Sequence, residues 1–277
     1  VEAFSPPGKG EMDPTFIMSL FYYMLFGLML SDAAYGAIIA IACGAVLLTK
    51  KNLDESMKKT MKMYLYCGLF TVFWGIMFGS YFGDVVDVVS QTFFGKKVTI
   101  PPLWFFPVEE PMRMLTFSML IGLIHIYAGL GMKLYQLIKE KLYKDAFYDV
   151  ISWYILLTSA VLILLSNKLF TDILGLKFIL PGYIGKWSAV LAILASVVII
   201  MTNGRESRNP FKRFLKGAYA LYGISGYLSD VLSYSRLLAL GLATGVIATV
   251  INKMGSMAGG GVFGAIVFTL VFLFGHA

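Results

Sequence analysis

Charged residues are scarce in this chain of 277 residues, and their scarcity argues against a water-soluble fold. Asp, Glu, Lys and Arg make up only 14% of the sequence, whereas a soluble domain carries about 25%. Hydrophobic residues make up 58%, and the mean hydropathy is +0.76. Apolar surface in this excess requires a lipid solvent, so we expect an integral membrane protein.

Cysteine and histidine are almost absent, which bears on redox and metal chemistry. The two cysteines, Cys43 and Cys67, lie in apolar runs and cannot build the disulfide framework of a secreted protein. No spacing of side chains indicates a metal site, and the sequence contains neither a P-loop nor a nucleophile paired with a base. We therefore expect no catalytic site, cofactor or metal on this chain.

Long runs without charge predict about eight membrane-spanning helices, because a helix needs about 20 apolar residues to cross the hydrocarbon. The predicted spans are residues 14–31, 33–49, 63–83, 114–132, 150–167, 187–204, 217–252 and 254–277. The first two are expected to form a tight helical hairpin around Asp32, and the last begins with a Gly-rich turn. The predicted fold class is all-α, a polytopic transmembrane helical bundle.

The basic residues predict the orientation of these spans. The loops 50–62, 133–144 and 203–216 together hold fourteen Lys and Arg, against six in the alternate loops. Basic loops stay in the cytoplasm, so we expect these three loops to be cytoplasmic and the segment 84–112 to face outward, along the membrane interface. The net charge of +7 is explained by these loops, and we expect no binding to nucleic acid.

The seventh span is unusually long and contains a buried charge. Residues 217–252 would form a helix of roughly 50 Å at 1.5 Å per residue, so we expect it to tilt in a bilayer core of about 30 Å. Arg236 lies 20 residues after Lys216 and 17 before Lys253, near the middle of the span. A charge at that depth faces a bundle interior, a wet cavity or an acidic partner, and it is a functional-site hypothesis by default.

Two patterns of small residues predict close helix packing. Gly75, Gly79 and Gly83 recur every four residues in FWGIMFGSYFGD. Gly241 and Gly245 make a G-x-x-x-G step beyond Arg236. The face that Arg236 shares by helical spacing also consists of small or apolar residues and hydroxyls: Ser229, Leu232, Ser233, Ala239, Leu240 and Ala243.

An internal salt bridge is the alternative explanation for Arg236. Asp230 is six positions away, on nearly the opposite side of the helix, and cannot easily pair with it. Asp32 or Asp84 could do so from other spans, although both lie at predicted helix ends and are expected to be structural or interfacial. His125 in the fourth span is expected to be a packing residue.

The segment SDVLSYSRLLALGLATGVIA (229–248) resembles the arginine-bearing seventh helix of the membrane stator subunit of rotary V/A-type ATPases, called I or a. PPGKGEMDPTFIMSLFYYMLFGLMLSDAAYG (6–36) is similar to the opening of that family's membrane domain. FWGIMFGSYFGD (73–84) is similar to its third helix. The form LLALGLA is typical of the prokaryotic branch, which implies a multi-pass protein of a prokaryotic cell membrane.

The resemblance implies that residues 1–277 are an ion-translocating domain without ATP-hydrolysing activity of its own. Its implied partners are ring subunits of the c/K type with membrane carboxylates, and soluble ATPase and peripheral-stalk subunits reached through an N-terminal domain. That domain and the second arginine of the eighth helix are expected to lie outside this sequence. Only Arg236 is carried over from the family. Further candidates for the ion half-channels are Asp230, Ser233, Tyr234 and His276.

Two other classes of function remain open from the residues. A secondary transporter would also explain an intramembrane arginine, although such proteins show inverted repeats and paired broken helices that are not evident here. A passive membrane anchor is the other alternative, and it predicts that Arg236 tolerates substitution.

Overall fold

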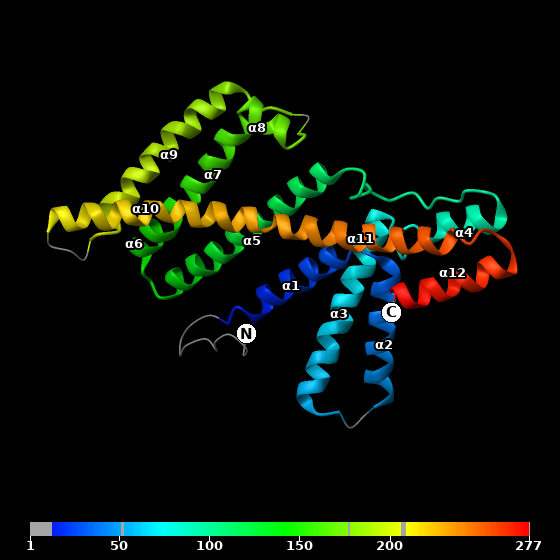
Figure 1. Cartoon of the computed structure of the whole chain (residues 1–277). Helices are drawn as coiled ribbons and strands as arrows, with labels where there is room; N and C mark the ends of the chain where they lie inside the picture. The colour runs from blue at the N-terminus through cyan, green and yellow to red at the C-terminus, as the bar shows by residue number, and fades with distance from the viewer. Residues whose placement is uncertain (1–12, 51–52, 177, 206–208, 277) are drawn as a thin grey trace. The chain divides into compact units, whose positions relative to one another are not determined.

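The computed structural model describes residues 13–50, 53–176, 178–205 and 209–276, and this part of the chain is built from helices without strands. Figure 1 labels these helices. The helices are α1 (Thr15–Leu30), α2 (Ala33–Thr49), α3 (Glu55–Phe78), α4 (Val85–Phe94), α5 (Pro111–Lys139), α6 (Tyr143–Ala146), the π-helix η1 (Phe147–Ile151), α7 (Ser152–Leu165), α8 (Lys168–Ile173), α9 (Gly182–Thr202), α10 (Pro210–Ser233), α11 (Ser235–Ser256) and α12 (Gly261–His276).

The predicted all-α membrane fold is confirmed, and each of the eight predicted spans corresponds to helix. Five helical stretches of the described chain are long and apolar enough to cross a membrane: 55–78, 111–139, 143–165, 182–202 and 214–256. Helices α1, α2 and α12 are apolar but have only 16, 17 and 16 residues, about 24 Å at 1.5 Å per residue. The number of spans therefore stays a prediction.

The predicted seventh span is a long helical stretch, 214–256, with one turn residue at Tyr234 between α10 and α11. α10 ends at Ser233, α11 begins at Ser235, and Tyr234 between them is in a turn. The amide of Tyr234 donates to the carbonyl of Val231 at 3.1 Å, and the hydroxyl of Ser233 donates to the carbonyl of Asp230 at 2.6 Å. Similar hydroxyl bonds of Ser225 and Thr244 lie within continuous helix, so the turn is confined to Tyr234.

The chain divides into two compact units, each described by itself. The first comprises Val1–Ile17 and Leu115–Ser235, and the second comprises Met18–Met114 and Arg236–Ala277. In the first unit α7 packs against α9, and α9 packs against α10. Its core is a cluster of Leu130, Val150, Trp153, Leu156, Leu157, Ala195 and Ile199.

In the second unit α2 and α3 form a helical hairpin, which Figure 1 shows as two antiparallel rods. The turn between α1 and α2 is as tight as predicted, but the prediction that these two helices pair was wrong, since α3 is the helix that packs along α2. A Cβ on Gly75 of α3 would overlap the backbone of Asp32 and Ala33. The hairpin is this close because Gly75 has no side chain.

The predicted glycine stripe of α3 is only partly present. The helix ends at Phe78, and Gly79 adopts the left-handed conformation of a C-cap, with φ at 69°. Gly83 lies in the following turn with φ at 67°, where a Cβ would be 2.8 Å from the Cβ of Ala248 in α11. Gly75 thus serves helix packing as predicted, whereas Gly79 and Gly83 shape the turn that follows.

Side chains of Asp cap two of the early helices. Before α1, Asp13 accepts hydrogen bonds from the hydroxyl of Thr15 and from its amide at 2.9 Å. These bonds hold the pKa of the Asp13 carboxyl below its usual value. Asp32 is the N-cap of α2 and accepts from the amides of Ala34 and Tyr35 at 3.0 and 3.2 Å. The bonds from these amides satisfy backbone donors that the start of a helix leaves without partners.

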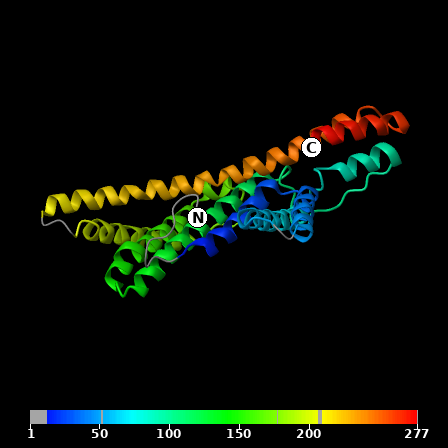
Figure 2. The same cartoon turned by 90° about the horizontal axis from the view of Figure 1, so that it is seen from below.

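α12 packs antiparallel on the C-terminal part of α11, as Figures 1 and 2 both show. A Cβ on Gly255 would lie 2.9 Å from Cδ2 of Phe268, and a Cβ on Gly275 would lie 2.5 Å from Cγ2 of Ile251. The Gly-rich turn predicted before the last span separates the two helices. This packing places the end of α12 beside α11.

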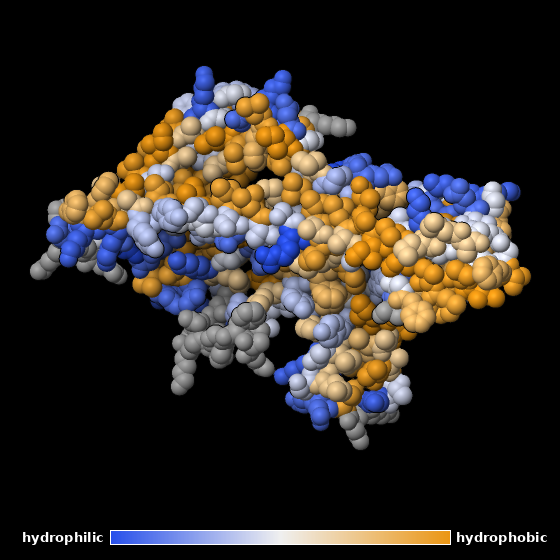
Figure 3. Space-filling view, viewed as in Figure 1, coloured by the Kyte–Doolittle hydropathy of each residue, from blue (hydrophilic) through white to orange (hydrophobic). Residues whose placement is uncertain are grey.

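Large apolar side chains are exposed along several helices. Trp187 and Ile193 on α9 are 69% and 64% exposed, and Phe274 on α12 is 87% exposed. Figure 3 shows apolar surface over both helices. Such surfaces are stable in lipid and not in water, which agrees with a multi-pass membrane protein.

Candidate functional site

Arg236 is the second residue of α11 and its side chain is exposed. The buried residues of α11 are Leu237, Gly241, Ala248, Asn252 and Gly255, and they form one helix face within the second unit. Arg236 lies on the other face, where Ala239, Leu240, Ala243, Ile247, Val250 and Met254 are exposed too. The arginine therefore stands at one end of an open, mostly apolar helix surface.

The carboxylates that could have paired with Arg236 inside its own unit are engaged elsewhere. Asp32 accepts from the hydroxyl of Ser80 at 2.6 Å and from the amides of Phe82 and Gly83 at 3.0 and 2.9 Å. Asp84 accepts from the side-chain amide of Asn252 at 3.0 Å. Among the described residues of the second unit, no carboxylate forms an ion pair with Arg236.

The G-x-x-x-G step does not belong to the Arg236 face. Gly241 is buried, and a Cβ there would lie 3.4 Å from the carbonyl oxygen of Leu28 and 3.5 Å from Oγ of Ser31. A Cβ on Gly245 would lie 3.4 Å from a methyl group of Val108. Both glycines therefore face their own chain. They are five and nine positions from Arg236, so they lie far around the helix from it.

Three of the candidate residues lie at the end of α10, in the first unit. Asp230 and Ser233 are exposed, and Tyr234 is partly buried. The hydroxyl of Tyr234 forms a hydrogen bond with Nδ1 of His125, and its ring packs over Gly122 of α5. His125, which the sequence suggested as a packing residue, thus has a specific polar partner at the break between α10 and α11.

His276 lies in the second unit, in a chain of polar contacts. Its Nδ1 is 2.5 Å from the hydroxyl of Tyr35 in α2, and its Nε2 is 3.1 Å from Oδ1 of Asn252 in α11. Asn252 in turn donates to the carbonyl of Phe82 at 2.7 Å and to Asp84. Asn252 is 16 positions after Arg236, about 24 Å along the helix. The structure therefore does not bring His276 next to the arginine.

Sequence reasoning missed Asn252 and Tyr35. Asn252 is only 1% exposed and joins α11, α12 and the turn after α3. A signal was present, because an asparagine within an otherwise apolar run belongs to the buried polar residues that hold membrane helices together. Tyr35 gave no such signal, since tyrosines are common at the ends of membrane helices.

A metal site is not evident in this geometry. No group of three or more His, Cys, Asp or Glu side chains within the described ranges could hold a metal ion. The two cysteines are free, and Cys67 is fully buried.

Comparison with curated proteins gives relatives over most of the chain. The A-type ATP synthase subunit I of Methanocaldococcus jannaschii is 33% identical over 99% of this chain and 41% of its own length. That of Thermococcus kodakarensis is 31% identical over 92% and 36%. The V-type ATP synthase subunit I 1 of Treponema pallidum is 26% identical over 90% and 38%. The chain spans about two fifths of the length of these relatives, and no family profile matches it.

Proposed function

We propose that this chain, which belongs to the A-type and V-type ATP synthase subunit I family, is the part of a rotary stator that moves cations across the membrane. In this proposal Arg236 displaces the transported cation from carboxylates on a ring of small helical subunits. ATP chemistry takes place on other subunits of the complex. The family places the chain in a membrane subunit of an ATP synthase, and the role of Arg236 is our inference from its surroundings.

The exposed guanidinium of Arg236 is the observation that carries the proposal. A charge at the middle of an apolar stretch costs about 2.5–3.5 kcal/mol on insertion scales, so it persists where a partner compensates it. No such partner exists among the described carboxylates of its own unit. The small and apolar side chains beside it, such as Ala239 and Ala243, leave room for a helix of another subunit.

The chemistry follows from the desolvation of a carboxylate. In lipid a ring carboxylate is protonated, or neutralised by a bound cation, because burial disfavours its charged form. Next to a guanidinium its pKa falls by roughly 1–3 units, so the proton or cation leaves. Two half-channels that open to opposite sides of the membrane convert this exchange into directed transport. The fixed charge of Arg236 between them prevents a direct leak.

Arginine suits this role better than lysine. A guanidinium stays protonated when it is desolvated and presents a planar fork of donors to a carboxylate, whereas a buried lysine readily loses its proton. We therefore expect that a positive charge without the guanidinium group is insufficient for cation transport at position 236.

The test is cation transport by the whole complex, reconstituted in vesicles, with Arg236→Ala and Arg236→Lys. We expect Arg236→Ala to abolish ATP-driven cation uptake while the complex assembles normally, and Arg236→Lys to restore only a small part. Lys253→Ala is the matched control, because Lys253 is an exposed basic residue at the other end of the same helix. Near-normal pumping by Arg236→Ala would reject the proposal, and substrate-dependent flux by the purified chain alone would favour a secondary transporter.

A further inference from the structure

The turn between α5 and α6 carries lysines and exposed apolar side chains together. We call residues 138–144 the α5–α6 turn; it belongs to the first unit. Its exposed basic side chains are Lys139, Lys141 and Lys144. Its exposed apolar side chains are Ile138, Leu142 and Tyr143, at 46%, 44% and 63%. Three lysines and one glutamate leave the turn with a net charge of plus two.

The acidic residues around the turn do not neutralise its lysines. Asp145 and Asp149 both pair with Arg205, which follows α9, at 2.5 and 3.0 Å. Glu140 accepts a hydrogen bond from the side-chain amide of Gln136 at 3.2 Å. Within the described ranges, no carboxylate forms an ion pair with any of the three lysines. Their charges are therefore available to a ligand from outside the chain.

Local backbone structure disfavours two of these lysines. α5 ends in a Schellman motif, in which the amide of Leu142 donates to the carbonyl of Leu137 at 2.9 Å. Lys141 has a φ of 60°, a conformation that glycine adopts freely and that a Cβ disfavours. Lys144 is the second residue of the helical stretch that continues into α7, where a positive charge opposes the helix dipole. An anionic ligand would offset both penalties.

The length of α5 places the turn at the level of lipid headgroups. α5 is apolar enough to cross a membrane and has 29 residues, about 43 Å at 1.5 Å per residue. The hydrocarbon core is only about 30 Å thick, so an end of the helix extends beyond it. Tyr135 and Tyr143 near this end are 55% and 63% exposed, and tyrosine is enriched where the membrane meets water.

We propose that the α5–α6 turn is a binding site for anionic lipids. Its lysines contact the headgroup phosphate, and its exposed apolar side chains lie against the acyl chains below. Basic segments next to membrane helices attract anionic lipids. A soluble acidic protein or free phosphate would leave the apolar side chains in water, whereas a lipid satisfies both kinds of group. On the predicted orientation the lipid belongs to the cytoplasmic leaflet, and the site is independent of the role of Arg236.

Photo-crosslinking identifies what contacts the turn. Photoreactive benzoylphenylalanine replaces Tyr143 in the whole complex, held in nanodiscs of phosphatidylcholine with a minor share of phosphatidylglycerol, and mass spectrometry identifies the adducts. We expect phosphatidylglycerol adducts to exceed the share of that lipid by at least about fivefold, the factor for about 1 kcal/mol per lysine near an anionic surface. Adducts with a protein subunit, or lipid adducts in proportion to the membrane composition, would overturn the inference.

Removing the three charges tests the contact with the headgroup. Lys139→Gln, Lys141→Gln and Lys144→Gln, combined in one variant with the same photoreactive residue, should lower the preference for phosphatidylglycerol by at least about fivefold. An unchanged preference in this variant would show that the lysines do not select the lipid.

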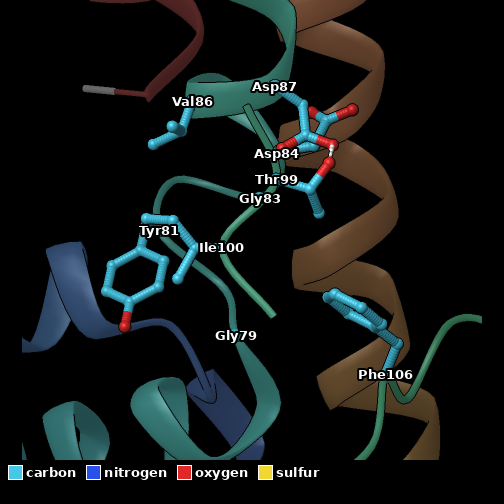
Figure 4. A pocket seen from close by; sticks show the side chains of 9 residues that line it. All are labelled: Gly79, Tyr81, Gly83, Asp84, Val86, Asp87, Thr99, Ile100 and Phe106. Atoms are coloured by element: carbon cyan, nitrogen blue, oxygen red, sulfur yellow. Dashed lines mark hydrogen bonds between the residues drawn. The ribbon is translucent and has the colours of Figure 1, made fainter. Parts of the chain in front are cut away.

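Lys97→Gln is the matched control for the loss of a lysine charge. Lys97 is exposed, but it already pairs with Asp87 at 3.6 Å. Asp87 also accepts a hydrogen bond from the hydroxyl of Thr99 at 2.9 Å, which Figure 4 shows as a dashed line. We expect the lipid preference at position 143 to stay unchanged in this control. An equal loss in both variants would overturn the inference.

Lys141→Gly separates lipid binding from folding. Glycine suits a φ of 60°, so this variant should assemble fully and melt no lower than the unsubstituted complex. Its preference for phosphatidylglycerol should nevertheless fall, because one of the three charges is gone. An unchanged preference would contradict the proposed site, whatever the melting temperature. None of these results bears on transport by Arg236→Ala, so the proposed function stands or falls separately.

Discussion

Asp32 illustrates how one buried carboxylate organises a turn between membrane helices. It is 3% exposed, caps α2 and also receives hydrogen bonds from Ser80, Phe82 and Gly83 beyond the end of α3. These bonds join the start of α2 to the turn after α3. The residue therefore fixes the turn that follows α3.

Replacing Asp32 should destabilise the second unit. In Asp32→Ala the partly buried donors of residues 80–83 lose their acceptor, at up to about 1–3 kcal/mol for each unsatisfied group. Thermal unfolding in detergent should shift to a clearly lower temperature. Asp54→Ala is the control, because Asp54 precedes α3 but makes no side-chain cap bond and is exposed. Equal melting temperatures for the two variants would contradict the structural role.

The contact between His276 and Tyr35 should be energetically coupled. Its geometry joins α12 to α2, and Asn252 completes it from α11. In a double-mutant cycle on unfolding, His276→Phe and Tyr35→Phe should each destabilise, and the double variant should do so by less than their sum. We expect a coupling of about 0.5–1.5 kcal/mol. Additive effects would show that the two side chains act separately.

At the scale of helices, the packing of α2 on α3 depends on one missing side chain. A Cβ on Gly75 would overlap backbone atoms of residues 32 and 33, which cannot move aside without shifting α2. Gly44 on α2 is different, since a Cβ there would meet only Cδ1 of Leu65 at 3.8 Å. An added methyl group should therefore be tolerated at position 44 and not at position 75.

Gly75→Ala should therefore weaken the hairpin, and Gly44→Ala should not. Overpacking costs about 1–3 kcal/mol, whereas alanine at an unstrained helix position stabilises by up to about 1 kcal/mol. The yield of folded complex and its melting temperature should fall for Gly75→Ala alone. A melting temperature at or above that of the unsubstituted protein would disprove the close approach of α2 to α3.

The sequence predicted long helices better than short ones. Charge-free runs identified the spans because the residues of a helix that crosses lipid are predominantly apolar. α4 was not predicted as a helix, because its ten residues begin with VVDVV, and β-branched residues favour strands. The turn at Tyr234 was not predicted either, since the hydropathy pattern does not reveal a local change in backbone hydrogen bonding.

At the scale of the whole molecule, the placement of basic loops makes a prediction about topology. If loop 50–62 is cytoplasmic, then Lys58→Cys in intact cells should resist a membrane-impermeant thiol reagent. Lys96→Cys, in the segment that follows α4, should react with it. Both residues are exposed, so the difference reports the side of the membrane, and mass spectrometry of labelled peptides measures it. Labelling of position 58 and not of position 96 would show that the orientation is the reverse of the predicted one.

The sequence by itself determined the solvent, the long helices and the position of Arg236 within an apolar stretch. These follow from composition and from the order of residues along one chain segment, and neither depends on which elements meet. The tertiary structure alone decided that Gly241 faces inward, that His276 joins Tyr35 and Asn252, and that Asp32 bonds to the turn after α3. Those contacts link residues far apart in sequence, and which helix faces meet depends on packing that no local pattern encodes.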